Sequence, residues 1–212
     1  MNVTVIGATG MVGTRLVAEA ASRGHRVTAV ARKIDDSLLP EGVRGESVDV
    51  KDPEKLAPVL GWADSAVVAL RPPTGQEHTL APLTRNVFEA AGNAGVPILI
   101  IGGAGPLTSP DDAETLVVDD TRHVAEEWRA IALASTEQLR VCHEYAEGTW
   151  VYLSPPAILA PGIRTGEYRR GTTTLLTAPD GTSHISVEDL AVAAVDEVEN
   201  PAGERHFTVA RA

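Results

Sequence analysis

Three glycines, each separated from the next by two residues, follow the first apolar run of the chain. The segment GATGMVG (residues 7–13) comes directly after residues 3–6, whose β-branched character predicts a strand, and a helical pattern of apolar residues follows it. Glycine at Gly7, Gly10 and Gly13 permits a tight turn, a close approach of backbone to phosphate, and close packing of helix on strand. The segment therefore predicts a dinucleotide-binding turn. An ordinary strand-to-helix turn is the simpler alternative.

Short apolar runs alternate with amphipathic stretches along the rest of the chain. This alternation is typical of repeated strand–helix units, and it predicts a doubly wound parallel α/β sheet in a single domain over residues 1–212. Prolines and glycines interrupt the pattern at residues 157–177, where we expect a small excursion on the substrate side. The expected strands are residues 3–6, 27–31, 46–50, 65–70, 97–101, 150–153 and 205–209, and the expected helices are residues 12–20, 53–60, 79–94, 124–145 and 187–199.

Composition disfavours several classes of partner. The net charge of −11 disfavours nucleic acid, because such sites need clustered Lys and Arg to neutralise phosphates. No apolar stretch approaches the length of a membrane span, and the first residues lack the pattern of a secretion signal. The single cysteine, Cys142, can form no internal disulfide, so we expect a cytoplasmic protein with an inert thiol. The acidic residues between 109 and 120 lack the spacing of a calcium loop and predict a solvated lid rather than a metal site.

Two adjacent cations follow the second expected strand. An acidic residue at this point normally bonds the ribose 2′-hydroxyl of NAD, whereas arginine accommodates the 2′-phosphate of NADP. The chain has Arg32 and Lys33 here and no carboxylate before Asp35. Charge complementarity therefore predicts NADP(H) in preference to NAD(H), and Arg32 is the better candidate because its planar fork matches a phosphate. A solvated basic pair on a loop is the alternative.

These segments together resemble a known family. GATGMVG, the ARK at residues 31–33, the Asp49-Val50 pair, the GGAG at residues 102–105, and the later SPPAILAPG and HISVEDLA look like the atypical short-chain dehydrogenases/reductases. More narrowly, the chain is similar to the NAD(P)H-binding subgroup that includes proteins named NADH-flavin reductases and NAD-dependent epimerase/dehydratases. The resemblance covers nearly the whole chain and implies an NAD(P)-binding Rossmann fold and an oxidoreductase.

The resemblance also implies how the cofactor would lie. Residues after the first strand would contact the pyrophosphate, those after the second the 2′-phosphate, and those after the third the adenine. Residues after the fourth, fifth and sixth strands would border the ribose, the nicotinamide ribose and the nicotinamide. Asp49 could instead be a capping or surface carboxylate, and Arg71 a surface or substrate-facing cation. The expected cofactor-binding residues are Gly7, Thr9, Gly10, Met11, Val12, Gly13, Arg32, Lys33, Asp49, Val50, Leu70, Arg71, Gly102, Gly103, Ser154 and Pro155.

The catalytic pair of the better-known family members is absent. They use Tyr-x-x-x-Lys, in which the lysine lowers the pKa of the phenol. All three lysines of this chain, Lys33, Lys51 and Lys55, precede every tyrosine. Carbonyl reduction by that pair is therefore not expected, and no catalytic residue is assigned.

Three functions remain open. The first is NADP(H)-dependent reduction of a small planar acceptor such as a flavin or quinone, because a positioned cofactor can deliver hydride without a dedicated acid. The second is a non-catalytic redox sensor or regulatory protein that binds NADP(H). The third is an NAD-dependent epimerase or dehydratase, which the missing pair and the short C-terminal region disfavour.

The candidate substrate residues lie in the last third of the chain. Tyr168 and Arg169 could line a site for an anionic or aromatic small molecule, or lie on a surface excursion. His184, before the last helix, could face the pocket or be a structural loop histidine. We expect the pocket walls at residues 103–120 and 157–174. The sequence does not indicate an oligomeric state.

Overall fold

The computed structural model, which describes residues 1–145 and 148–212, contains one eight-stranded sheet. The strand order is β3-β2-β1-β4-β5-β6-β10-β8, and all neighbours are parallel except β8, which runs antiparallel to β10. This order confirms the predicted doubly wound sheet, with the chain reversing direction across the sheet at β1 and β4. The strands are β1 (Asn2–Ile6), β2 (Arg26–Ala31), β3 (Arg44–Ser47), β4 (Ser65–Val68), β5 (Ile98–Ile101), β6 (Trp150–Ser154), β8 (Tyr168–Gly171) and β10 (His206–Arg211).

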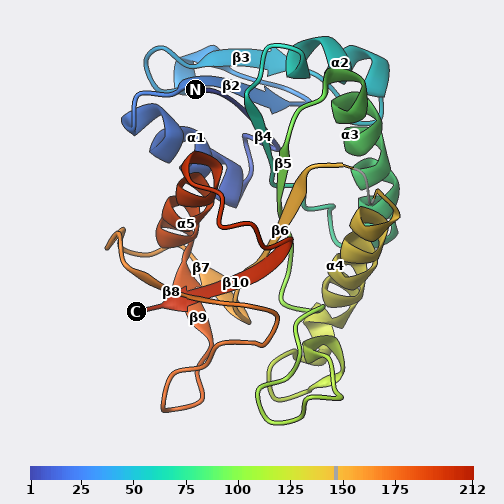
Figure 1. Cartoon of the computed structure of the whole chain (residues 1–212), viewed down its shortest axis with the longest axis vertical. Helices are drawn as coiled ribbons and strands as arrows, with labels where there is room; N and C mark the ends of the chain where they lie inside the picture. The colour runs from blue at the N-terminus through green and yellow to red at the C-terminus, as the bar shows by residue number, and fades with distance from the viewer. Residues whose placement is uncertain (146–147) are drawn as a thin grey trace.

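Helices cover both faces of the sheet (Figure 1). Two of them, α1 (Met11–Ser22) and α5 (Val187–Glu199), pack together on one face. The other face carries α2 (Pro53–Leu60), α3 (Leu80–Ala94) and α4 (Glu126–Glu144). Because the sheet lies between two helical layers, its strands are buried on both sides, which explains the nearly continuous apolar runs of β4 and β5.

Shorter elements connect these layers. The 3₁₀ helices are η1 (Asp36–Leu38), η2 (Glu77–Thr79) and η3 (Val117–Asp119), and β7 (Ile158–Ala160) pairs with β9 (His184–Ser186) in a separate two-stranded sheet.

Local capping explains where several helices begin and end. The Asp52 side chain accepts a hydrogen bond from the Lys55 N–H, and Pro53 occupies the first turn of α2. Ser186 caps α5 by accepting a hydrogen bond from the Asp189 N–H. Gly95 ends α3 in the left-handed conformation with φ 68°. These positions agree with the boundaries that the sequence predicts.

The third strand differs from its prediction. We expected residues 46–50, but β3 covers Arg44–Ser47, where it pairs with β2 in parallel register. Val48 donates one more backbone hydrogen bond to Ala31 of β2, and Val50 has no such bond within the described residues; both are buried in the core beneath the α2–α3 layer. The apolar alternation that suggested a strand therefore reflects burial of a loop.

The connection between β5 and α4 is also different from the solvated lid that we expected. Leu107, Val117 and Val118 are buried in a third apolar cluster together with Val124. Asp120 is buried as well and accepts a hydrogen bond from the Ser109 hydroxyl at 2.7 Å. The other acidic residues of this segment are exposed. The connection is therefore a packed structure with an acidic outer surface.

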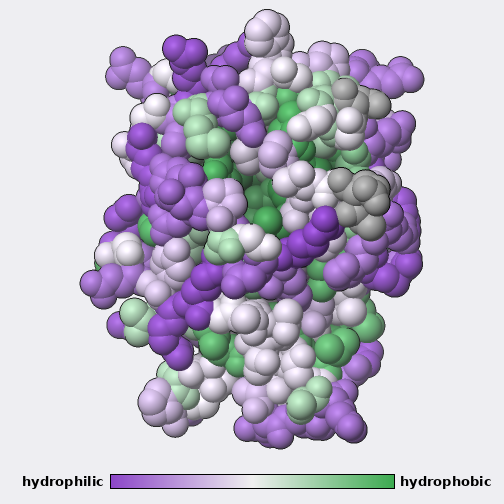
Figure 2. Space-filling view, in the orientation of Figure 1, coloured by the Kyte–Doolittle hydropathy of each residue, from purple (hydrophilic) through white to green (hydrophobic). Residues whose placement is uncertain are grey.

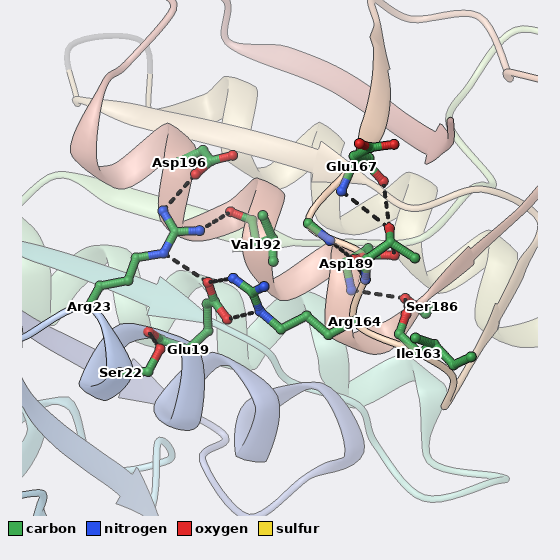
Figure 3. A network of polar contacts seen from close by, with 12 residues as sticks. Glu19, Ser22, Arg23, Ile163, Arg164, Glu167, Ser186, Asp189, Val192 and Asp196 are labelled. Atoms are coloured by element: carbon green, nitrogen blue, oxygen red, sulfur yellow. Dashed lines mark hydrogen bonds and ion pairs between the residues drawn. The ribbon is translucent and has the colours of Figure 1, made fainter.

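A polar network holds the loop after β7 against the α1–α5 layer (Figure 3). Arg164 donates two hydrogen bonds to the buried carboxylate of Glu19, at 2.8 and 2.9 Å, and Arg23 donates a third at 2.8 Å. The Arg164 guanidinium, followed by Arg23, lowers the pKa of Glu19 against the opposing effect of burial. On the same loop, Thr165 and Gly166 donate backbone hydrogen bonds to Asp189. The network fixes the segment that follows β7.

Two further observations concern the class of protein. Among the described residues, no helix has both the length and the apolar character that crossing a membrane requires. Cys142 is buried, and burial raises the pKa of its thiol to about 12, as an unreactive core cysteine requires. The cytoplasmic location remains a prediction.

Candidate functional site

A cavity of about 870 Å³ lies at the carboxyl ends of six parallel strands. Its walls include the residues that directly follow those strands: Gly7 after β1, Arg32 after β2, Val48 after β3, Ala69 after β4, Gly102 after β5 and Pro155 after β6. Ligands of open α/β sheets bind in the crevice outside these ends, at the point where the strand order reverses. The topology therefore places the cavity where a dinucleotide is expected.

The glycine-rich turn has no room for side chains at two of its positions. Gly7 has φ +84°, and a Cβ there would overlap the carbonyl oxygen of Ala69. A Cβ on Gly13 would overlap the Gly7 carbonyl oxygen and come 2.8 Å from the Ala8 Cα. Gly7 and Gly10 line the cavity, whereas Gly13 is buried beneath it. Gly13 therefore contributes packing of α1 on the turn rather than a cavity wall.

The N-terminus of α1 faces this turn with its backbone donors free of side-chain caps. Gly10 is the N-cap and makes no side-chain hydrogen bond, and the first turn contains no acidic residue. Thr9, Met11 and Val12 line the cavity at this point. Uncapped N–H groups and the helix dipole attract an anion, so the turn fits a pyrophosphate.

The cations after β2 also line the cavity. Arg32 and Lys33 are exposed, and neither has an ion pair with another residue in the described part of the chain. Asp35, the nearest carboxylate in sequence, accepts hydrogen bonds from the backbone and hydroxyl of Ser37 and caps η1. Both cations are therefore available to a phosphate, and the carboxylate is engaged elsewhere.

The next wall is formed by residues after β3 and β4. Asp49 and Val50 line the cavity, as do Leu70 and Arg71. The Asp49 carboxylate accepts a hydrogen bond from the Lys51 N–H at 3.0 Å, which supports the alternative that it stabilises its own turn. Together with Gly102, Gly103 and Pro155, fourteen of the sixteen expected cofactor residues line one cavity, and their role in binding remains a prediction.

Ser154, expected beside the nicotinamide, does not reach the cavity. Its hydroxyl is fully buried and lies 2.9 Å from Nε2 of His206 on the neighbouring strand β10. Burial, and to a lesser extent the positive charge of His143, lowers the pKa of His206 to about 4. The pair is a structural contact between β6 and β10.

This depressed pKa predicts acid sensitivity. In the unfolded chain this histidine has its ordinary pKa of 6.5, so it takes up a proton at a higher pH than folded His206 does. The contribution of His206 to the unfolding free energy is therefore fully present above pH 6.5 and is lost as the pH falls toward 4. At about 1.4 kcal/mol per pKa unit, discounted for partial exposure, we expect His206 to account for roughly 2 kcal/mol of the unfolding free energy lost between pH 7 and 4.5. Urea unfolding of wild type and His206→Gln at both pH values measures this. Carboxylates titrate in both proteins, so an equal loss in the two would contradict the assignment.

Three expected substrate residues lie away from the cavity. Tyr168 and Arg169 belong to β8, which forms the far edge of the sheet beyond β10. The Tyr168 hydroxyl donates to Asp196 at 2.8 Å, and Arg169 donates to the Arg211 and Thr177 carbonyls. His184 is half-buried in β9 and does not line the cavity either. Strand order, which the sequence does not show, carries Tyr168 and Arg169 to the far edge of the sheet, whereas His184 pairs with β7 in the separate two-stranded sheet.

The remaining cavity wall comes from helices rather than from the segments that we expected. Only Gly103–Gly105 and residues 157–159 of the two expected walls contribute. The helical contributors include Leu80 and Leu83 of α3 and Trp128, Ile131 and Ser135 of α4. The spacing of the α4 residues by three or four positions shows in the sequence that they share one helix face, but it does not show what that face borders.

An aromatic residue and a cation meet at this end of the cavity. The Arg71 guanidinium carbon lies 5.5 Å from the centre of the Trp128 ring, and Trp128 is half-exposed. Both side chains line the cavity. The pair offers a flat apolar surface beside a positive charge, which suits a planar or anionic molecule.

Comparison with known proteins bears on the class of cofactor. A family model described as NAD(P)H-binding matches residues 7–201. YwnB of Bacillus subtilis (strain 168), an uncharacterized protein, is 33% identical over 212 residues, covering 99% of this chain and 98% of YwnB. The solved structure of a "putative epimerase" from Bacteroides thetaiotaomicron has a TM-score of 0.90 and 32% identity over 99% of this chain and 96% of that one. That of a "putative NADH-flavin reductase" from Streptococcus pneumoniae has a TM-score of 0.86 and 26% identity over 100% of both chains.

Proposed function

This chain belongs to the NAD(P)H-binding family, whose fold is that of the atypical short-chain dehydrogenases/reductases, and from this premise we propose that it is an NADP(H)-dependent reductase. Its acceptor is a small planar molecule such as a flavin or a quinone. The preference for NADP(H) is supported by Arg32 and Lys33, two cations that line the cavity without ion-pair partners among the described residues. When bound, the dihydronicotinamide supplies a hydride.

The observation that carries the proposal is the extent of the cavity. Besides the expected cofactor residues, its lining includes Trp128 and Ile131 of α4, and we assign this part of the cavity as the acceptor compartment. A compartment of this composition accepts a flat apolar ring, and the Arg71 guanidinium beside Trp128 favours negative charge on that ring or its substituents. Stacking there would hold the acceptor against the cofactor, which is the main requirement for direct hydride transfer.

The tyrosines support a mechanism without a phenolic acid. Tyr145, Tyr152 and Tyr168 are the three tyrosines of the chain, and none lines the cavity. Tyr152 comes nearest in the fold, but it is fully buried and its hydroxyl donates to the Ser135 carbonyl oxygen at 2.9 Å. Burial raises the pKa of Tyr152 far above its usual value. It therefore acts as a core residue, and epimerase chemistry that needs a tyrosinate is disfavoured.

A sensor that only binds the cofactor is the main competing function. Such a protein would present a broad apolar surface to a partner. On the face drawn in Figure 2, hydrophilic side chains cover much of the surface and apolar ones show in smaller areas between them. This face therefore favours a small-molecule acceptor over a docked protein.

Binding and turnover can be measured in sequence. We expect NADPH to bind more tightly than NADH in a fluorescence titration of the cofactor. Stopped-flow mixing of the NADPH complex with FMN, or with menadione, should then oxidise the cofactor over many turnovers. NADPH binding without turnover of either acceptor would favour the sensor, and failure to bind either nucleotide would contradict both functions.

Replacing Trp128 tests where the acceptor lies. We expect Trp128→Ala to raise KM for FMN about tenfold, because one base-like ring loses a stacking partner worth about 1–3 kcal/mol, while the Kd for NADPH stays within twofold. Trp62→Ala is the matched control, since Trp62 is 81% exposed and does not line the cavity. Steady-state kinetics of both variants measures the effect, and equal KM values for the two would place the acceptor elsewhere.

A further inference from the structure

The cavity is lined by cations although the protein is acidic. The whole chain has a net charge of −11, yet four of the described lining residues are cationic and only Asp49 among them is a carboxylate. No ion pair neutralises any of these four cations within the described part of the chain. A local excess of positive charge favours ligands with several negative charges. The four cations are Arg32, Lys33, Lys51 and Arg71.

The strand order divides these cations into two groups. Arg32 and Lys33 follow β2 and Lys51 follows β3, whereas Arg71 follows β4. Strand β1, which leads into the glycine-rich turn and α1, lies between the two groups. In the proposed arrangement, the cations after β2 bind the 2′-phosphate and the N-terminus of α1 binds the pyrophosphate, so every phosphate of NADP(H) has a partner. Arg71 is the cation that this arrangement leaves without an anion.

The backbone around Arg71 is held in place. The N–H of Ala69 donates to the Ile6 carbonyl oxygen at 2.8 Å, which continues the contact between β4 and β1. Pro72, the next residue after Arg71, is buried, and a proline restricts both its own backbone and that of the residue before it. The Arg71 guanidinium carbon lies 5.5 Å from the centre of the Trp128 ring. The charge is therefore placed beside the aromatic ring of the acceptor compartment.

The Arg71 guanidinium is accessible to a ligand. Its side chain is exposed and lines the cavity, and the indole of Trp128 is half-exposed as well. Glu77, the nearest carboxylate along the chain, accepts a hydrogen bond from the Gly75 N–H at 3.0 Å and makes no ion pair with Arg71. The N–H donors of arginine form a planar fork that matches the oxygens of a phosphate or carboxylate. A ring packed on the exposed part of the indole would carry its substituents toward this fork.

We infer that the acceptor bears an anionic group, a phosphate monoester or a carboxylate, on a substituent of its planar ring, and that Arg71 binds this group. The inference rests on the proposed reductase function and narrows its substrate class. Arg71 acts on binding of the acceptor, whereas the hydride comes from the cofactor. FMN has the required combination of ring and phosphate, and riboflavin has the same ring without the phosphate.

The two flavins and two replacements of Arg71 test the assignment by steady-state kinetics at saturating NADPH. For wild type we expect kcat/KM about tenfold higher with FMN than with riboflavin, because a charge-assisted fork binds the phosphate. Arg71→Gln should raise KM for FMN about tenfold and leave KM for riboflavin within about twofold, so the preference disappears. Arg71→Lys keeps the charge without the fork and should raise KM for FMN only about threefold. The Kd for NADPH should stay within about twofold in both variants, because the cofactor phosphates have other partners.

Arg129 supplies a matched control. It follows Trp128 in α4, forms an ion pair with Asp119 at 2.7 Å and does not line the cavity. Arg129→Gln removes the same charge from the same region of the protein. It should leave KM for both flavins within about twofold, since an exposed ion pair outside the cavity contributes little.

Equilibrium binding of both flavins to the NADP⁺ complex, followed by flavin fluorescence, is the second readout. Wild type should bind FMN about tenfold more tightly than riboflavin, and Arg71→Gln should bind the two equally. If this difference is found but NADPH is not oxidised, the reductase function is contradicted and the assignment of Arg71 stands. Turnover of menadione without binding of either flavin would overturn the inference and leave the reductase function standing. Equal affinity of wild type for the two flavins, equal losses for both in Arg71→Gln, or a parallel loss of NADPH affinity would also overturn it.

Discussion

Gly13→Ala should destabilise the protein by about 3 kcal/mol, although alanine is the better helix former. The new Cβ would overlap the carbonyl oxygen of Gly7 and lie 2.8 Å from the Cα of Ala8, both of them backbone atoms that cannot rotate away. Relief of this overlap requires α1 to move off the phosphate turn, and overpacking of a tight core costs roughly 1–3 kcal/mol or more. The displaced N–H groups should also weaken NADPH binding at least tenfold.

Thermal unfolding gives the measurement, and another helical glycine provides the control. A loss of about 3 kcal/mol corresponds to a fall in Tm of roughly 6–12 °C for a chain of this size. Gly92 lies in α3, and a Cβ there meets nothing within 4 Å. Gly92→Ala should therefore stabilise by about 0.5–1 kcal/mol, as expected when alanine replaces glycine in an open helix. A Gly13→Ala variant as stable as Gly92→Ala would show that the close packing of α1 on the turn is dispensable.

Arg32→Ala should remove the preference for NADPH. Arg32 follows β2, lines the cavity and has no ion pair in the described chain, so its guanidinium is free to bind the 2′-phosphate. Charge-assisted hydrogen bonds of this kind contribute about 1.5–3 kcal/mol, which corresponds to a rise of roughly 10- to 100-fold in the Kd for NADPH. NADH lacks the phosphate, so its Kd should change less than threefold. Fluorescence titration with both nucleotides measures the two values.

A cation at the other end of the same strand controls for net charge. Arg26 begins β2, is exposed and does not line the cavity. The strand separates it from Arg32 by roughly 17–20 Å, which exceeds the screening length of about 8 Å at physiological salt. Arg26→Ala should therefore leave both Kd values within twofold. Similar weakening by the two variants would point to a general electrostatic effect, and a loss of NADH affinity equal to that of NADPH would contradict a 2′-phosphate site.

The cofactor half of the cavity could be located from the sequence for a topological reason. Each expected residue there follows an apolar run, and the carboxyl ends of parallel strands must meet at one edge of the sheet. Gly7, Arg32 and Gly102 reach the same cavity on that basis alone. Ser154 is the exception, because its side chain, at the end of β6, contacts His206 on β10 instead of the cavity. That contact depends on which strand lies beside β6.

The acceptor half could not be located in this way. Trp128 reaches the cavity because α4 and the turn before it pack against Ala104 and Ala157, and no periodicity in the sequence encodes that contact. Tyr168, which we expected at the substrate site, lies away from the cavity because β8 pairs with β10 at the far edge of the sheet.

The sequence by itself thus determined the alternation of strands and helices, the glycine turn and the cations after β2, because each depends on residues adjacent in the chain. Tertiary structure alone decided the order of β10 and β8, the burial of Asp120 and the walls of the acceptor compartment. Those features arise from contacts between distant segments, and such contacts are selected by the packing of the whole core.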